Sequence, residues 1–138
     1  MQGYTIDKLE IGQKASFAKT VTETDIYLFA GITGDVNPAH INQEYAKGTM
    51  FKDRIAHGMF SAGLISAVIG VQLPGPGSIY MSQTLKFTAP VYFGDTITAT
   101  VEVIEIIAEK NRVILKTTCT NQDGKSIIEG EATVMAPK

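Results

Sequence analysis

The feature that most constrains the fold of this chain is a long stretch without charge, from Gly58 to Gln72. A helix formed by this stretch would be apolar nearly all round, and such helices are normally buried. The stretch is too short to cross a bilayer, which takes about 20 apolar residues, and the Pro-Gly-Pro-Gly sequence at 74–77 ends it. We therefore predict one long buried helix, around which the rest of the chain packs.

The sequence after this helix alternates between apolar and polar residues, as half-buried strands do. The alternation is regular from Thr96 to Val103, and its phase slips at 104–106, which predicts a β-bulge. Further strands are predicted at 79–88, 112–120 and 126–135, with a turn at 121–124 and a short strand near 16–20. One long helix and four or five antiparallel strands predict an α+β fold, in which a curved antiparallel sheet wraps around the central helix.

Length and charge narrow the class of protein. The 138 residues fit a single domain, 1–138, with a core of its own. The net charge of −2 argues against a nucleic-acid-binding protein, which would normally carry a basic patch. A sheet of so few strands leaves exposed edges, so we expect a homodimer or a higher homo-oligomer.

Cysteine usage and the N-terminal sequence bear on the compartment. Cys119 is the only cysteine, so a disulfide framework and a thiolate metal cluster are excluded, and we expect an inert buried side chain. Residues 1–7 contain neither the basic nor the apolar region of a signal peptide. We therefore expect a cytoplasmic protein that does not act on a membrane.

The first half of the chain carries helix signals. Residues Thr22 to Asp25 resemble a capping box that opens a helix, and Gly34 is expected to end it. Asn37-Pro38 predicts a turn. A second short helix is expected after Asn42, with Gly48 closing it.

Asp35 and His40 lie five positions apart, on either side of the Asn-Pro turn. Taken alone, Asp35 could form an Asx-turn and His40 could be an ordinary hydrogen-bonded histidine. Together they bring an acid and a base beside the apolar helix, which opens at His57-Gly58. This combination favours general acid–base chemistry on an activated carbonyl. For His57 itself we expect a structural or positional role.

The order of these elements resembles the MaoC-like (R)-specific enoyl-CoA hydratases, which have the hot-dog fold. The matching segment between Asp25 and Asp95 contains Gly-Asp-x-Asn-Pro-x-His at 34–40, followed by three further elements at 54–59, 73–80 and 87–95. The His-Phe-Pro-type element of the fatty-acid-synthesis dehydratases, which share the fold, is not found in this chain. The resemblance therefore implies a hot-dog domain and a reversible hydratase.

The resemblance also implies roles for individual residues. Asp35 and His40 match the pair that holds and activates water, and Gly58 matches the residue whose backbone N–H binds the thioester oxygen. Ser66 matches a serine that lies near the active-site acid in relatives. With Asn37, it is expected to support the pair by hydrogen bonding. The substrate would be an acyl-CoA thioester, and no metal or redox cofactor is expected.

Hydration of a trans-2-enoyl thioester makes two demands that these residues would meet. Water is a poor nucleophile, and general acid–base catalysis by Asp35 and His40 is worth a factor of about 10²–10⁴. A buried, apolar setting should raise the pKa of Asp35 and lower that of His40. Attack at C3 also pushes negative charge onto the thioester oxygen. The free N–H of Gly58, at the positive end of the helix, would stabilise that charge.

Several alternatives remain open at this point. Lys52, Arg54 and Lys86 are candidates for contacts with CoA phosphates, although surface basic residues usually do no more than face solvent. A hot-dog acyl-CoA thioesterase would also use a carboxylate, and a non-catalytic acyl-CoA-binding subunit would need neither Asp35 nor His40. The sequence pattern does not assign acyl chain length or the choice between CoA and acyl-carrier protein.

Overall fold

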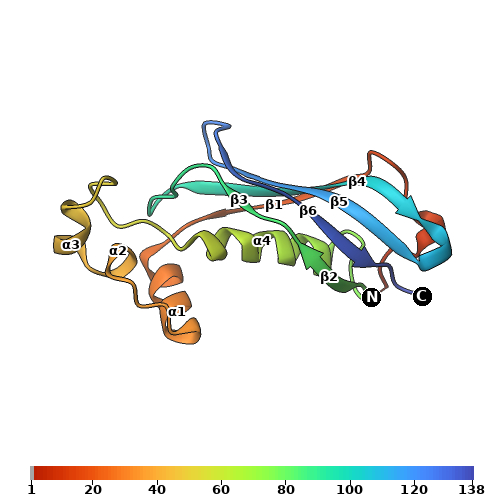
Figure 1. Ribbon diagram of the computed structural model, residues 1–138, viewed down its shortest axis with the longest axis horizontal. Coiled ribbons are helices and arrows are strands. Elements are labelled where there is room, and N and C mark those ends of the chain that lie inside the picture. Colours follow the sequence, from red (N-terminus) through yellow and green to blue (C-terminus); the bar gives the residue numbers. More distant parts are fainter. Residues whose placement is uncertain (1) are drawn as a thin grey trace.

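A six-stranded antiparallel sheet curves around helix α4 (Gly58–Val71) in the computed structural model, which describes residues 2–138 (Figure 1). The strands are β1 (Lys14–Thr20), β2 (Ile79–Gln83), β3 (Lys86–Phe87), β4 (Thr96–Ile107), β5 (Arg112–Thr120) and β6 (Ser126–Met135). Their order in the sheet is β1-β4-β5-β6-β2, and β3 also pairs with β6. The α+β architecture predicted from the sequence is thus confirmed, with six strands in place of four or five.

The core lies between α4 and the concave face of the sheet. The apolar residues of the alternating segment in β4, from Ile97 to Val103, are fully buried at every second position. On α4, Ile65 and Val68 are also fully buried. Burial of one such aliphatic side chain is worth roughly 1.5–3 kcal/mol, so this two-layer core holds the helix against the sheet.

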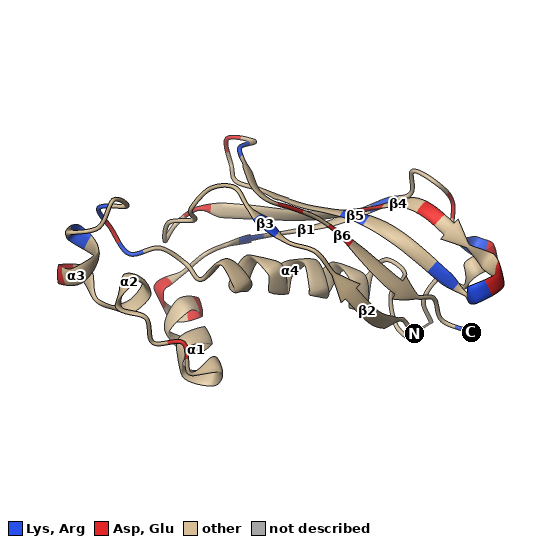
Figure 2. Cartoon of the chain, in the orientation of Figure 1, with Lys and Arg blue, Asp and Glu red and all other residues tan. Residues whose placement is uncertain are grey.

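The predicted helix is less buried than its composition suggests. Met59 and Val71 are 55% and 61% exposed, and the small residues Gly63, Ser66 and Gly70 between them are exposed as well. Figure 2 shows that this helix carries no charged residue. The expectation that α4 is buried all round is therefore wrong for the isolated chain, because the sheet covers only one side of it.

The sheet has two irregularities. The pairing of β4 with β5 shifts between Val103 and Glu105, which confirms the predicted bulge. The single strand predicted at 79–88 is instead divided into β2 and β3. The chain crosses closely over β6 there, where a Cβ on Gly130 would lie 1.9 Å from the Thr84 carbonyl oxygen. The glycine in β6 permits this crossing, and the divided strand is a correction to the prediction.

Three short helices extend beyond one end of the sheet (Figure 1): α1 (Glu23–Thr33), α2 (Pro38–Ile41) and α3 (Gln43–Lys47). The predicted capping box at Thr22 and Asp25 is present, with both reciprocal hydrogen bonds. Asn42 caps α3 as expected. The remaining elements are two single 3₁₀ turns, η1 (Ile6–Lys8) and η2 (Ala108–Lys110). Among residues 2–138, no helix has both the length and the apolarity that a membrane crossing requires.

Candidate active site

The loop between α1 and α2 is shaped by two capping residues. Helix α1 ends at Gly34, which has a left-handed φ of 80°, a conformation that glycine adopts without strain. The side chain of Asn37 then caps α2, and Pro38 occupies the first helical position. The predicted turn is therefore also the start of a one-turn helix, and that helix carries His40. An Asn-Pro pair is a known helix-start signal, so the sequence could have indicated this helix.

Asp35 lies in this loop with its side chain exposed to solvent. One carboxylate oxygen accepts a hydrogen bond from the backbone N–H of Asn37 at 3.3 Å, which forms the Asx-turn considered from the sequence. The buried setting expected for this carboxylate is thus wrong for the isolated chain, because the loop lies beyond the end of the sheet.

His40 has a defined tautomer. Its Nδ1 lies 2.8 Å from the backbone oxygen of Ile55, and a carbonyl oxygen can only accept, so Nδ1 carries the hydrogen. The other ring nitrogen, Nε2, is then left with a lone pair. Burial lowers the pKa of His40, and the hydrogen bond to Ile55 opposes this only in part. The lowered pKa expected for His40 is confirmed in direction.

This lowered pKa leads to a prediction for the pH profile. The acid limb of kcat/KM reports the ionisation of essential groups in the free enzyme. Because His40 must be neutral to accept a proton, we expect that limb to have its midpoint below 6.5, the ordinary value for histidine. Activity should therefore persist at pH values where a solvent-exposed histidine would be largely protonated. A midpoint above 6.5 would contradict a role for neutral His40 in the Asp35–His40 pair.

His57 is part of the same cluster. Its side chain is 2% exposed, and its Nε2 lies 2.9 Å from the backbone oxygen of Asp35. Its ring stacks on that of His40 with the centroids 3.9 Å apart, and it also contacts the ring of Phe29. The sequence suggested a structural or positional role for His57 but gave no sign of its contacts with both members of the pair.

Gly58 occupies the first position of α4, directly after His57. Its N–H has no partner within the helix, as is general for the first turn. A Cβ built on Gly58 would lie 2.7 and 2.8 Å from two ring carbons of Phe87. Any side chain at this position would require the half-exposed ring of Phe87 to move. No sequence signal singled out Phe87 as a neighbour.

A cavity of about 520 Å³ opens beside these residues. His40 and Gly58 contribute to its lining, which is otherwise largely apolar. Ser61, also in the lining, is 1% exposed, and within residues 2–138 its hydroxyl has no hydrogen-bond partner. The volume falls within the range of small-molecule sites, about 300–1,000 Å³.

Other residues singled out in the sequence lie farther away. Ser66 is on the exposed face of α4, eight residues from Gly58, which is about 12 Å along a helix. It makes no hydrogen bond to any described residue through its side chain. Lys52 and Lys86 are exposed and do not line the cavity. The fold does not bring these three residues into the Asp35–His40 cluster of their own chain.

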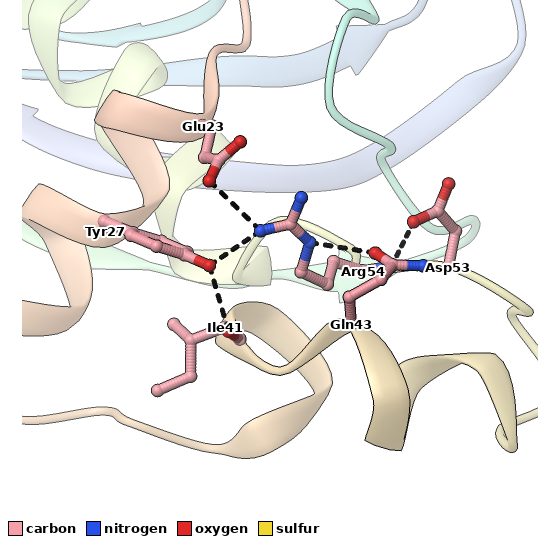
Figure 3. A network of polar contacts seen from close by, with 6 residues as sticks. All are labelled: Glu23, Tyr27, Ile41, Gln43, Asp53 and Arg54. Carbon is pink, nitrogen blue, oxygen red and sulfur yellow. Dashed lines mark hydrogen bonds and ion pairs between the residues drawn. The ribbon is translucent and has the colours of Figure 1, made fainter.

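Arg54 has extensive contacts within the chain (Figure 3). Its guanidinium group donates hydrogen bonds to Glu23 in α1 at 3.3 Å and to the hydroxyl of Tyr27 at 2.6 Å. It also donates to the side chain of Gln43 in α3 at 3.0 Å, and it packs over the ring of Phe93. Arg54 therefore ties α1 and α3 to the segment that leads into α4.

Comparisons with known proteins identify the family of the chain. The model of the MaoC-like domain family matches residues 7–126. The chain is 61% identical over 131 residues to an (R)-specific enoyl-CoA hydratase of Rhodospirillum rubrum, a match that covers 95% of this chain and 90% of the relative. It is 48% identical to a 3-hydroxybutyryl-CoA dehydratase of Methylorubrum extorquens, covering 96% of this chain and 83% of the relative. Both names describe hydro-lyases.

A solved structure shows the same fold. The R-hydratase PhaJ1 of Pseudomonas aeruginosa, in its unliganded form, superposes with a TM-score of 0.94 at 50% identity. The match covers 99% of this chain and 88% of that protein. The sequence match, the fold and these relatives together show that the chain belongs to the MaoC-like family, with the hot-dog fold of the (R)-specific enoyl-CoA hydratases.

Proposed function

We propose that this chain catalyses the reversible addition of water to trans-2-enoyl-CoA, giving (R)-3-hydroxyacyl-CoA. The observation that carries this proposal is the placement of two proton acceptors close together, one of which, His40, lines the cavity. A carboxylate oxygen of Asp35 and a ring nitrogen of His40 lie within 4.8 Å of each other. One water molecule can donate a hydrogen bond to each of two acceptors at such a separation.

In the proposed reaction, the water oxygen forms a bond to C3 as one of its protons passes to the Asp35–His40 pair. The electron pair of the C2–C3 double bond moves toward the thioester, whose oxygen becomes an enolate. The pair then returns a proton to C2, and the enolate collapses to the 3-hydroxyacyl thioester. The reverse sequence dehydrates the product.

The N–H of Gly58 is proposed to stabilise the enolate oxygen. It lies at the N-terminus of α4, where unpaired N–H groups and the helix dipole favour negative charge. One such donor is worth roughly 3 kcal/mol in the transition state. Proton transfer and oxyanion stabilisation account for the chemistry, so the mechanism calls for neither a metal nor a redox cofactor.

The test is an assay with purified protein and crotonyl-CoA, followed by longer enoyl-CoA substrates. We expect the ultraviolet absorbance of the enoyl thioester to fall, no free thiol to appear, and chiral chromatography to identify an (R)-3-hydroxy product. Release of CoA thiol would instead indicate the rival thioesterase. Binding of enoyl-CoA without turnover would indicate a non-catalytic acyl-CoA-binding subunit, and either result would overturn the proposal.

We further propose that the protein is a cytoplasmic homodimer. The two sheet edges differ: β1 carries Lys14 and Lys19, a common protection against edge pairing. The β2–β3 edge instead exposes Ile79, Met81 and Phe87 at 56%, 42% and 51%. A second copy that pairs there would also cover the exposed small-residue face of α4.

In such a dimer, Ser66 would lie at the interface between the two copies and could contact the site of the second copy. Within its own chain Ser66 is too far along α4 to reach the Asp35 carboxylate, but it lies on the face that a second copy would cover. The exposed loop that carries Asp35 would be shielded in the same way. Lys52 and Lys86 stay as proposed contacts for the CoA phosphates.

We predict that Met81→Glu, which places a charge on the β2–β3 edge, shifts the protein from dimer to monomer. Light scattering should then give the mass of one 14.9 kDa chain in place of two. Ile11→Glu is the matched control, because Ile11 is 64% exposed but lies in the turn before β1. A wild-type protein that is already monomeric, or a Met81→Glu protein that stays dimeric, would contradict this interface.

A further inference from the structure

His57 contacts every part of the proposed site, although the proposed mechanism does not use it. Its side chain holds the backbone of Asp35 at 2.9 Å and stacks on the ring of His40, with the ring planes at 30°. Its backbone forms the N-cap of α4, directly before Gly58. We infer that His57 is a positioning residue, which keeps the Asp35 loop and the His40 ring aligned with the N-terminus of α4. This inference rests on the proposed function.

A small set of hydrogen bonds connects the segment around His57 to the residues from Asp35 to His40. Three bonds join residues 55 and 57 to the loop: the Ile55 N–H donates to Ala39 at 3.2 Å, the His40 ring donates to Ile55 at 2.8 Å, and the His57 ring donates to Asp35. The Ala56 N–H anchors this segment by donating to the backbone oxygen of Val91 at 2.8 Å. Residues 55–57 contribute backbone groups to the first two of these bonds and a side chain only to the third. A substitution of His57 can therefore remove the bond to Asp35 without removing the other two.

The same contacts fix the tautomer of His57. Because the Asp35 carbonyl can only accept, Nε2 of His57 carries the hydrogen. The other ring nitrogen, Nδ1, is buried and has no partner among residues 2–138. Among the described residues, the ring therefore makes one hydrogen bond, to the backbone of Asp35, and otherwise packs on His40 and Phe29.

These atoms are arranged for packing and not for metal binding. Asp35, His40 and His57 each offer one possible ligand atom within 4.8 Å of the others. One nitrogen of each imidazole, however, already has a partner: Nδ1 of His40 donates to Ile55, and Nε2 of His57 donates to Asp35. The positive N-terminus of α4 would also oppose a cation at this place.

Two substitutions separate the contacts of His57. His57→Phe keeps an aromatic ring to stack on His40 but removes the donor to Asp35. His57→Gln keeps an amide donor but removes the ring. We expect each to lower kcat by about 10–100-fold, as is usual when the partner of a catalytic group is lost, and His57→Ala to lower it further. KM should change by less than about threefold, because His57 does not line the cavity.

The control is Val101→Ala, a substitution in the core of β4 where Val101 is fully buried. It should lower the melting temperature and leave kcat of the folded protein unchanged. The inference is overturned if His57→Phe and His57→Gln both keep kcat within about threefold of wild type. It is also overturned if they raise KM with kcat unchanged, which would make His57 a substrate-binding residue.

An independent measurement separates this inference from the proposed function. The chain has only two histidines, so both imidazoles can be followed by NMR during a pH titration. Asp35 and His57 are the titratable groups that face His40. We expect the titration midpoint of His40 to move up toward 6.5 in His57→Gln, where water can reach the ring. A wild type without hydratase activity refutes the proposed function, whereas an unchanged His40 titration in His57→Gln refutes the positioning role.

Discussion

Asp35→Asn should lower kcat for enoyl-CoA hydration by about 10²–10⁴, and His40→Gln should do the same, because general acid–base catalysis contributes that much. The asparagine keeps an oxygen that can accept the hydrogen bond from the backbone N–H of Asn37, so the loop should hold its shape. It loses the negative charge with which the proposed Asp35–His40 pair would hold and activate water. The glutamine removes the imidazole lone pair that the hydrogen bond to Ile55 leaves free.

The measurement is steady-state kinetics on variants whose fold has been checked by circular dichroism. Asp53→Asn is the matched control, since it makes the same chemical change at an exposed aspartate near the site and should leave kcat close to wild type. If Asp35 and His40 act on one water as a unit, the double variant should be little worse than either single one. Near-normal turnover in either single variant would refute the mechanism.

Gly58→Ala should be the second severe substitution. The added methyl group would lie 2.7 Å from a ring carbon of Phe87, closer than real contacts allow, so the ring or the start of α4 must move. Such crowding usually costs about 1–3 kcal/mol of stability. Displacement of the backbone N–H from the thioester oxygen should lower kcat/KM by about 10²–10³.

A second substitution separates the effect of crowding on stability from the effect on catalysis. In Gly58→Ala with Phe87→Leu, the smaller side chain should restore the melting temperature, while kcat/KM stays low because the methyl group still obstructs the approach of the thioester. Gly31→Ala is the control: Gly31 lies in α1 with open space around its Cβ position, so alanine should stabilise the helix by about 0.5–1 kcal/mol with unchanged activity. A fully active Gly58→Ala protein would rule out this oxyanion site.

The arrangement of the three short helices was only partly predictable. Capping signals located the start of α1 and α3, and Gly34 marked the end of α1, because caps act within a few residues of one another. Arg54 was predicted as a possible phosphate contact. The structure shows it bound to Glu23 and Tyr27, 31 and 27 residues away along the chain, and no local pattern encodes such a pairing.

The sequence by itself predicted the kinds of elements and the candidate reacting residues. Alternation, caps and the Gly-Asp-x-Asn-Pro-x-His element depend on neighbours in the chain, so they can be recognised before folding is known. Only the tertiary structure decided that His57, 22 residues from Asp35, joins that residue to His40, and that Phe87 covers Gly58. It also left one face of α4 and the Asp35 loop exposed in the single chain. Periodicity predicts which residues are apolar, but which surface covers them is set by packing between distant segments and between chains.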